Sequence, residues 1–172
     1  IAFSFLSLSQ SSFAFPIPTA AETSNTSAVM MLEGSSNYDF NGIVKLNNCS
    51  GSLVRFESSK VSDKAMVLTN GHCVSIGGGF MQPNEYVANK QVSSRSFRFL
   101  KPNGEAASGS VTSTKILYGT MTGTDMALYE VSNTFQEIEA KFSVTPLTIS
   151  SVRPEVNTDI NILSGYWQTG YS

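Results

Sequence analysis

The feature that most constrains the fold is a series of short apolar segments, separated by Gly, Asn, Ser and Pro, that runs from residue 43 onward. Short segments bounded by turn-forming residues are typical of β-strands. None of these segments needs a helix. The candidate strands are residues 42–46, 50–55, 65–69, 96–100, 114–118, 126–131 and 159–164. The sequence therefore predicts an all-β fold, an antiparallel sheet that is closed into a β-barrel or folded into a sandwich.

Two turn signals support this interpretation. Residues 101–104 read Lys-Pro-Asn-Gly and directly follow the candidate strand 96–100. Proline presets φ and Asn-Gly favours a tight turn, so we expect the chain to return there as a hairpin. Three consecutive glycines at 77–79 are too flexible for the interior of a strand and predict a loop.

Composition excludes several kinds of partner. The chain has 172 residues, which is the size of one domain, and 41% of them are hydrophobic. Its net charge is -2 and Lys and Arg form no cluster, so we expect no nucleic-acid partner. No stretch reaches the roughly 18 apolar residues of a spanning helix, so we expect no membrane partner after processing. The oligomeric state is not indicated.

The first residues have the character of a secretory signal. Residues 1–15 are an uncharged run of mainly Phe, Leu, Ala and Ser, which leads to a Pro pair and to small residues with a plausible cleavage site after Ala21. We expect residues 1–21 to be the remnant of this signal and residues 22–41 to be a flexible mature N-terminus. The alternative is a first strand of the mature fold. Because an initiating Met and a basic segment are missing, we expect the sequence to begin inside a longer gene product, which is secreted or extracellular.

The chain has two cysteines, Cys49 and Cys73. In an oxidising compartment, an even pair most simply forms a disulfide. It would close a loop of about 25 residues, for which the chain-entropy model gives about 3 to 4 kcal/mol of stabilisation. Two buried free thiols are the alternative. One His and two Cys fall short of the usual four ligands, so we expect no metal site.

The only histidine, His72, follows the apolar segment 65–69 and directly precedes Cys73. A strand end beside a disulfide is a rigid place for an imidazole. The unperturbed pKa of histidine lies near neutral pH, so such a side chain is suited to be a general base. Taken alone, a single histidine is more often structural than catalytic.

Asp125 directly precedes the alternating segment 126–131. A partly desolvated carboxylate needs a compensating donor or charge, and the N–H of a histidine would serve. Such a carboxylate would fix the imidazole tautomer and stabilise the imidazolium. The simpler interpretation is an Asp that caps the turn after Gly123.

Three segments, taken in order, are far more specific than any one of them. Residues 49–54 read C-S-G-S-L-V, residues 68–74 read L-T-N-G-H-C-V and residues 124–128 read T-D-M-A-L, with 53 positions between His72 and Asp125. This arrangement resembles the trypsin-like (chymotrypsin-fold) serine proteases. Residues 146–149 and 163–167 look like the interdomain linker and the first strand of the second barrel in that family. The resemblance covers roughly residues 43–167.

The resemblance implies a role for each matched residue. His72 would be the general base, Asp125 its orienting acid, and Cys49 with Cys73 the disulfide. It also implies two six-stranded antiparallel barrels with a catalytic cleft between them. Residues 42–140 would form the first barrel, and residues 141–172 the linker and the start of the second. The implied function is peptide-bond hydrolysis by a secreted serine endopeptidase, with a protein or peptide substrate and no cofactor.

The sequence also departs from the family. No G-D-S-G-G segment carries a nucleophilic serine, and no G-x-S-x-G motif replaces it. We therefore expect this chain to be the amino-terminal part of the enzyme and to be inactive alone. Asn70-Gly71 replaces the usual Ala-Ala pair, which we interpret as a mild change. Two alternatives remain: a nonenzymatic binding module that retains His72 and Asp125, or another secreted β-sandwich in which His72 is structural.

Overall fold

The computed structural model describes residues 39–92, 94–159 and 163. The signal remnant at 1–21 and most of the N-terminal segment 22–41 lie outside this part of the chain. Most of the candidate strand 159–164 lies outside it as well.

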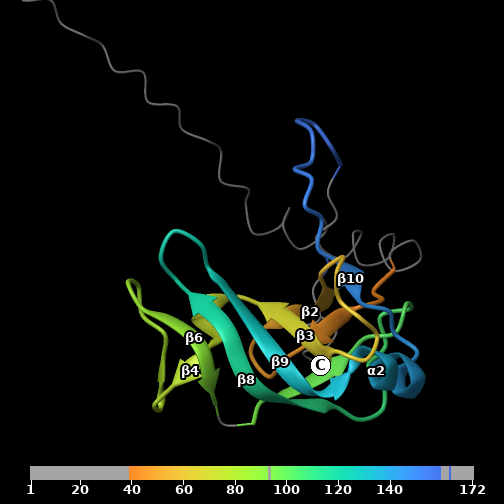
Figure 1. Cartoon of the computed structure of the whole chain (residues 1–172), viewed down its shortest axis with the longest axis horizontal. Coiled ribbons are helices and arrows are strands. Elements are labelled where there is room, and N and C mark those ends of the chain that lie inside the picture. Colours follow the sequence, from red (N-terminus) through yellow and green to blue (C-terminus); the bar gives the residue numbers. More distant parts are fainter. Residues whose placement is uncertain (1–38, 93, 160–162, 164–172) are drawn as a thin grey trace, which may run out of the picture. The chain divides into compact units, whose positions relative to one another are not determined.

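Six strands form a closed ring. They are β1 (Ile43–Lys45), β2 (Ser50–Arg55), β3 (Lys64–Thr69), β7 (Ser96–Phe99), β8 (Val111–Thr120) and β9 (Met126–Thr134). Their order is β1-β7-β8-β9-β3-β2, and β1 also pairs with β2, so the sheet returns to its first strand. Every pairing in the ring is antiparallel. The predicted all-β barrel is confirmed (Figure 1), and the sandwich alternative is wrong.

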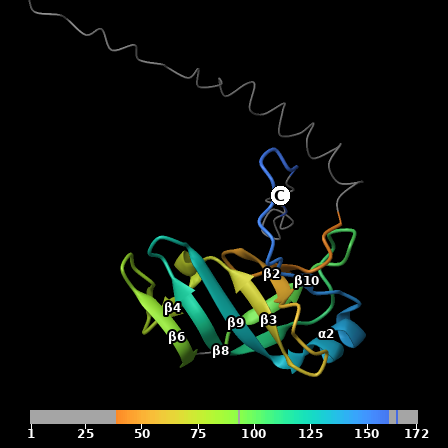
Figure 2. The same cartoon turned by 45° about the horizontal axis from the view of Figure 1, so that its top comes forward.

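The six candidate strands between residues 42 and 131 are all confirmed, but the sequence pattern missed four others. The missed strands are β4 (Ser75–Ile76), β5 (Gly79–Phe80), β6 (Tyr86–Gln91) and β10 (Leu147–Thr148). Strand β6 lies beside β8, as Figure 2 also shows. Strand β10 is parallel to the end of β2. Strand β6 carries mostly exposed polar residues, so it lacks a clear apolar alternation.

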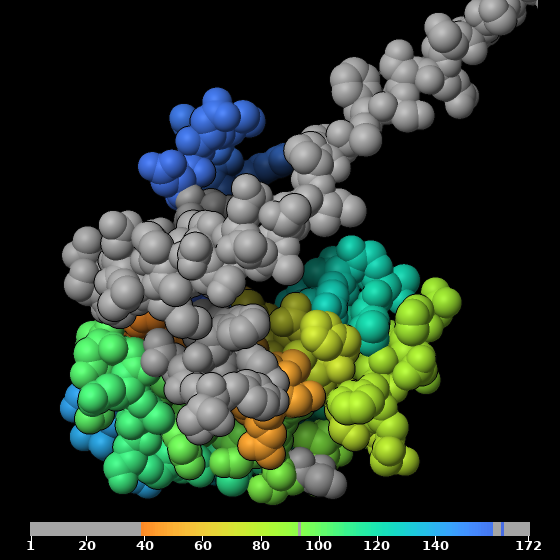
Figure 3. Space-filling model, turned by 180° about the vertical axis from the view of Figure 1, so that it is seen from behind, coloured from red at the N-terminus to blue at the C-terminus, as the bar shows by residue number. Residues whose placement is uncertain are grey.

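The predicted hairpin turn at 101–104 is confirmed, and the predicted glycine loop is confirmed at Gly77 and Gly78, whereas Gly79 is the first residue of β5. The backbone N–H of Gly104 donates to the carbonyl of Lys101 at 2.8 Å, and Leu100 forms an antiparallel bridge with Ala106. In the glycine run, Gly77 and Gly78 have φ of 62° and 90° and make the turn between β4 and β5. In the view from behind (Figure 3), the yellow-green segments after β3 project on one side of the barrel, and the green segment after β7 lies on the opposite side.

One helix, α2 (Phe135–Phe142), was not predicted. It begins with a capping box, in which the Thr134 hydroxyl accepts from the Glu137 backbone and the Glu137 side chain accepts from the Thr134 backbone. Its apolar residues Phe135, Ile138 and Phe142 are buried, which is the spacing of one helical face. Within the described residues, no helix has the length and apolar character to span a membrane.

The barrel encloses an apolar core. In β7 and over most of β9, buried residues alternate with more exposed ones, and Phe97 and Phe99 of β7 are fully buried. The ring of Phe97 packs against Tyr129 of β9 with the ring centres 5.4 Å apart. Phe99 packs against Phe142 of α2 at 5.2 Å, which joins the helix to the barrel. The core therefore fixes the strand ends from which the candidate site is built.

Candidate functional site

His72 lies in a single tight turn that follows β3. The 3-10 turn η1 (Gly71–Cys73) begins one residue after the strand, and the Val74 N–H donates to the carbonyl of Gly71 at 2.9 Å. Gly71 and Cys73 are buried, whereas 54% of the His72 side chain is exposed. The turn thus anchors its two ends in the barrel and presents the imidazole at the surface.

Asp125 comes from the loop between β8 and β9. Strands β3 and β9 are antiparallel neighbours, and Thr69 lies opposite Ala127. The residues just after β3 and just before β9 therefore meet at the same end of the barrel. This register brings together two residues that are 53 positions apart in the sequence.

The two candidate residues are joined by two hydrogen bonds. The Nδ1 atom of His72 lies 2.6 Å from Oδ2 of Asp125, and the backbone N–H of His72 donates to Oδ1 at 2.9 Å. A carboxylate can only accept, so the proton of this bond belongs to Nδ1 of the ring. In a neutral ring, the Nε2 atom then carries the lone pair. The Asp125 carboxylate is bound to His72 and does not serve the turn after Gly123.

Asn70 is a further contact that the sequence did not indicate. Its side-chain amide donates to the carbonyl of Asp125 at 3.3 Å and approaches Oδ2 at 3.4 Å. Asn70 therefore supports the carboxylate from the side of β3. No local sequence motif indicates this role of Asn70, because its partner lies 55 positions away.

The electrostatics of the pair favour an ionised Asp125. Partial desolvation raises the pKa of this carboxyl, but the hydrogen bonds from the backbone and the ring of His72 and the charge of that ring act in the opposite direction. The result is a pKa below its ordinary value of 3.8. Asp125 is thus a carboxylate at neutral pH, the state in which it can hold an Nδ1–H.

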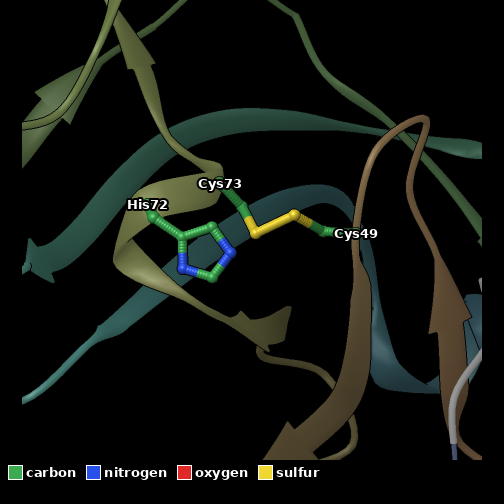
Figure 4. Close-up of side chains that lie close together, drawn as sticks. All are labelled: Cys49, His72 and Cys73. Atoms are coloured by element: carbon green, nitrogen blue, oxygen red, sulfur yellow. A yellow bond between two sulfur atoms is a disulfide. The ribbon is translucent and has the colours of Figure 1, made fainter. Parts of the chain in front are cut away.

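The predicted disulfide between Cys49 and Cys73 is confirmed. The two Cα atoms are 6.3 Å apart, and both residues are buried. The disulfide ties the start of β2 to the turn that carries His72, and Figure 4 shows the imidazole beside it. The alternative of two free thiols is wrong. A formed disulfide is consistent with an oxidising, extracellular compartment.

Cys49, His72 and Cys73 also form the group of candidate metal ligands found among the described residues. Their ligand atoms lie within 4.8 Å of one another. Zinc and similar metals bind cysteine as the thiolate, however, and the two sulfur atoms here are bonded to each other. While the disulfide is intact, this group lacks the thiolates that a Cys and His metal site requires.

Gly71 corrects one sequence interpretation. The Asn70-Gly71 pair was predicted to be a mild replacement for Ala-Ala. A Cβ atom at position 71 would lie 2.0 Å from the carbonyl oxygen of Thr120 and 3.1 Å from Oδ1 of Asp125. An alanine therefore does not fit without a shift of the backbone, because the end of β8 at Thr120 packs directly on this glycine.

A hollow of about 370 Å³ adjoins the pair on the side of β2 and β3. Its lining residues come from β2, from the end of β3, from the start of β9 and from one residue near the end of the chain. They are Ser50, Gly51, Ser52, Leu68, Thr69, Asn70, Asp125, Met126 and Leu163. The hollow leaves open space next to the carboxylate.

No protein-family model, curated protein or solved structure matches the chain. A fixed imidazole with an Nδ1–H···carboxylate bond can take a proton at Nε2 and later return it. Within the described residues, Nε2 of His72 makes no hydrogen bond, and 54% of the side chain is exposed.

Proposed function

We propose that the chain is part of a secreted serine endopeptidase of the trypsin-like type. The observation that carries this proposal is the pair of hydrogen bonds that Asp125 accepts from His72 at one end of a six-stranded antiparallel barrel. In this proposal, His72 is the general base and Asp125 orients it. The substrate is a protein or peptide.

Three further features support the proposal. The segments around Cys49, His72 and Asp125 occur in the order and spacing of the trypsin-like proteases. The disulfide of that family is present beside the histidine. Strands β3 and β9, beside whose ends the two residues lie, are antiparallel neighbours in the barrel. The disulfide and the signal-like residues 1–21 together favour export of the protein.

The reaction would proceed through an acyl-enzyme. A serine hydroxyl attacks the peptide carbonyl carbon, a bond forms between its oxygen and that carbon, and Nε2 of His72 takes the hydroxyl proton. The C–N bond then breaks, and the amine leaves with the proton from Nε2. Water repeats the sequence on the ester: it gives a proton to His72, and the released serine oxygen recovers it. Asp125 stabilises the imidazolium in both halves.

The proposal needs a serine that reaches Nε2 of His72. We assign this serine, and the donors that stabilise the oxyanion, to a part of the protein outside the described residues. The hollow beside Asp125 is where an additional segment would approach the pair. On this account, the 172-residue chain does not hydrolyse peptides by itself.

The test uses the complete gene product. The coding sequence is read beyond Ser172, and the whole product is expressed and treated with a fluorophosphonate, which labels an activated serine. We expect one labelled serine, and we expect the label to be lost with His72→Ala and strongly reduced with Asp125→Asn. Asp159→Asn is the matched control, because Asp159 is exposed and its side chain makes no hydrogen bond or ion pair with the described residues.

The outcomes separate the candidate functions. Labelling that persists in His72→Ala would contradict the proposed role of this residue. A complete product that has no downstream serine segment and no labelling would favour the nonenzymatic binding module, in which the His72–Asp125 pair is retained without catalysis.

A further inference from the structure

Arg95 reaches the turn of His72 from a different part of the barrel. Its Nη1 atom donates to the carbonyl oxygen of Cys73, the residue next to His72. Its Nη2 atom donates to Oδ1 of Asn48 at 2.6 Å, and Asn48 directly precedes Cys49. One planar guanidinium therefore bridges the two chain segments that the disulfide also joins.

The same guanidinium contacts β9, the strand that begins directly after Asp125. Nη1 lies 3.5 Å from the hydroxyl of Tyr129, and the guanidinium carbon is 5.9 Å from the centre of the Tyr129 ring. Tyr129 is fully buried in β9, four residues after Asp125. Arg95 is thus connected to both halves of the His72–Asp125 pair.

The backbone of Arg95 is itself fixed. Its N–H donates to the side chain of Ser113 at 2.9 Å, and its carbonyl accepts from the Ser113 N–H at 2.9 Å. Ser113 is a buried residue of β8. The side chain is half-buried, and within the described residues its partners are neutral groups with no carboxylate among them. A cation in this position acts through directed hydrogen bonds, not through an ion pair.

We infer that Arg95 is a positioning residue, a second and noncovalent clamp that holds the turn of His72 against β9 so that the imidazole stays within reach of Asp125. The inference rests on the proposed function, because it assigns Arg95 a role in the arrangement of the general base. The disulfide restrains the two chain segments covalently. The disulfide does not connect these segments to β9. Arg95 adds this connection through Tyr129, in the strand that follows Asp125.

The test measures solvent exchange of the Nδ1 proton of His72 by NMR on the full chain, in which His72 is the only histidine. In Arg95→Met we expect this proton to exchange about tenfold faster or more, because a hydrogen bond from a charged donor shifts a local opening equilibrium by roughly that factor. The matched control is Arg98→Met, since Arg98 is exposed and its side chain makes no hydrogen bond or ion pair with the described residues. We expect Arg98→Met to exchange like the wild type.

Backbone amides of Leu68 and Leu128 report global stability in the same samples. If they lose protection to the same extent as the Nδ1 proton, the role of Arg95 is only structural and the inference is wrong. The inference is also wrong if the Nδ1 proton of Arg95→Met exchanges at the same rate as that of the wild type. Should Arg95→Met fail to fold, Asn48→Ala decides the question: it removes one acceptor at an exposed turn, and it must accelerate exchange in the same direction.

This experiment is independent of the serine chemistry. Failure of the fluorophosphonate test would leave the exchange result valid, and wild-type exchange in Arg95→Met would leave the labelling result valid. The two failures are therefore distinguishable.

Discussion

The carboxylate of Asp125 holds His72 at two points, since Oδ1 accepts from the backbone N–H and Oδ2 accepts from the ring. The backbone bond fixes the position of the turn, and the ring bond fixes the orientation of the imidazole. Both depend on the antiparallel register of β3 and β9, which brings the two loops to the same end of the barrel. This pair is the basis of the predictions below.

The stability of the fold should depend on the ionisation of Asp125. The pKa of Asp125 is lower in the folded chain than its ordinary value of 3.8. Between these two pKa values the unfolded chain binds more protons, so the stabilisation is present above pH 3.8 and is lost as the pH falls through the folded pKa. Urea unfolding as a function of pH measures this loss. Asp125→Asn should lack this acid-induced loss of stability, whereas Asp159→Asn should retain it. Equal acid sensitivity of the wild type and Asp125→Asn would contradict the assignment.

Gly71 should be intolerant of a side chain. In Gly71→Ala the new Cβ would overlap the carbonyl of Thr120, and forced overpacking of this kind costs about 1 to 3 kcal/mol in the free energy of unfolding. The control is Gly79→Ala, because a Cβ atom there meets nothing within 4 Å. Denaturant unfolding of the two variants should differ clearly. Two equally stable variants would show that the end of β8 does not pack on Gly71.

Removal of the disulfide should destabilise the barrel. Cys49 and Cys73 are 24 positions apart. We expect the double variant Cys49→Ala/Cys73→Ala to lose about 3 to 4 kcal/mol in the free energy of unfolding, chiefly because its unfolded chain is less restricted. Urea unfolding measures this loss. Relative to the oxidised wild type, the double variant and the reduced wild type should lose the same free energy of unfolding. A wild-type protein that is unaffected by reduction would argue against this contribution.

The capping box should stabilise helix α2. Thr134→Ala removes the hydroxyl that accepts from the Glu137 N–H, and loss of an N-cap costs about 0.5 to 2 kcal/mol. Thr124→Ala is the matched control, because Thr124 is an exposed loop residue whose side chain makes no hydrogen bond with the described residues. Denaturant unfolding compares the two. A control that is as destabilised as Thr134→Ala would refute the role of the cap.

In strand β7, the apolar alternation of the sequence is also the burial pattern of the structure. Phe97 and Phe99 alternate with Ser96 and Arg98, and the structure buries only the two aromatic rings. Strand β6 has no such alternation, because most of its side chains face solvent and its pairing with β8 is made by the backbone. Helix α2 was not predicted, although its capping residues Thr134 and Glu137 are only three positions apart. The prediction of elements depended on apolar segments alone.

The site was predictable where its residues belong to motifs and not where they act through long-range contacts. His72 and Asp125 each follow or precede an apolar strand in a recognisable segment. Arg95 and Asn70 reach partners 22 and 55 positions away, and their own surroundings in the sequence give no hint of these contacts. The cost of a side chain at Gly71 likewise depends on the carbonyl of Thr120, which only the folded barrel brings near.

The most direct test of the account is the ¹⁵N spectrum of the imidazole of His72, recorded on the full chain at a pH where the ring is neutral. Because His72 is the only histidine, the spectrum reports one ring. The account predicts the Nδ1–H tautomer in the wild type and its loss in Asp125→Asn. A wild-type ring in the Nε2–H tautomer, or a tautomer that Asp125→Asn leaves unchanged, would contradict a carboxylate-held general base.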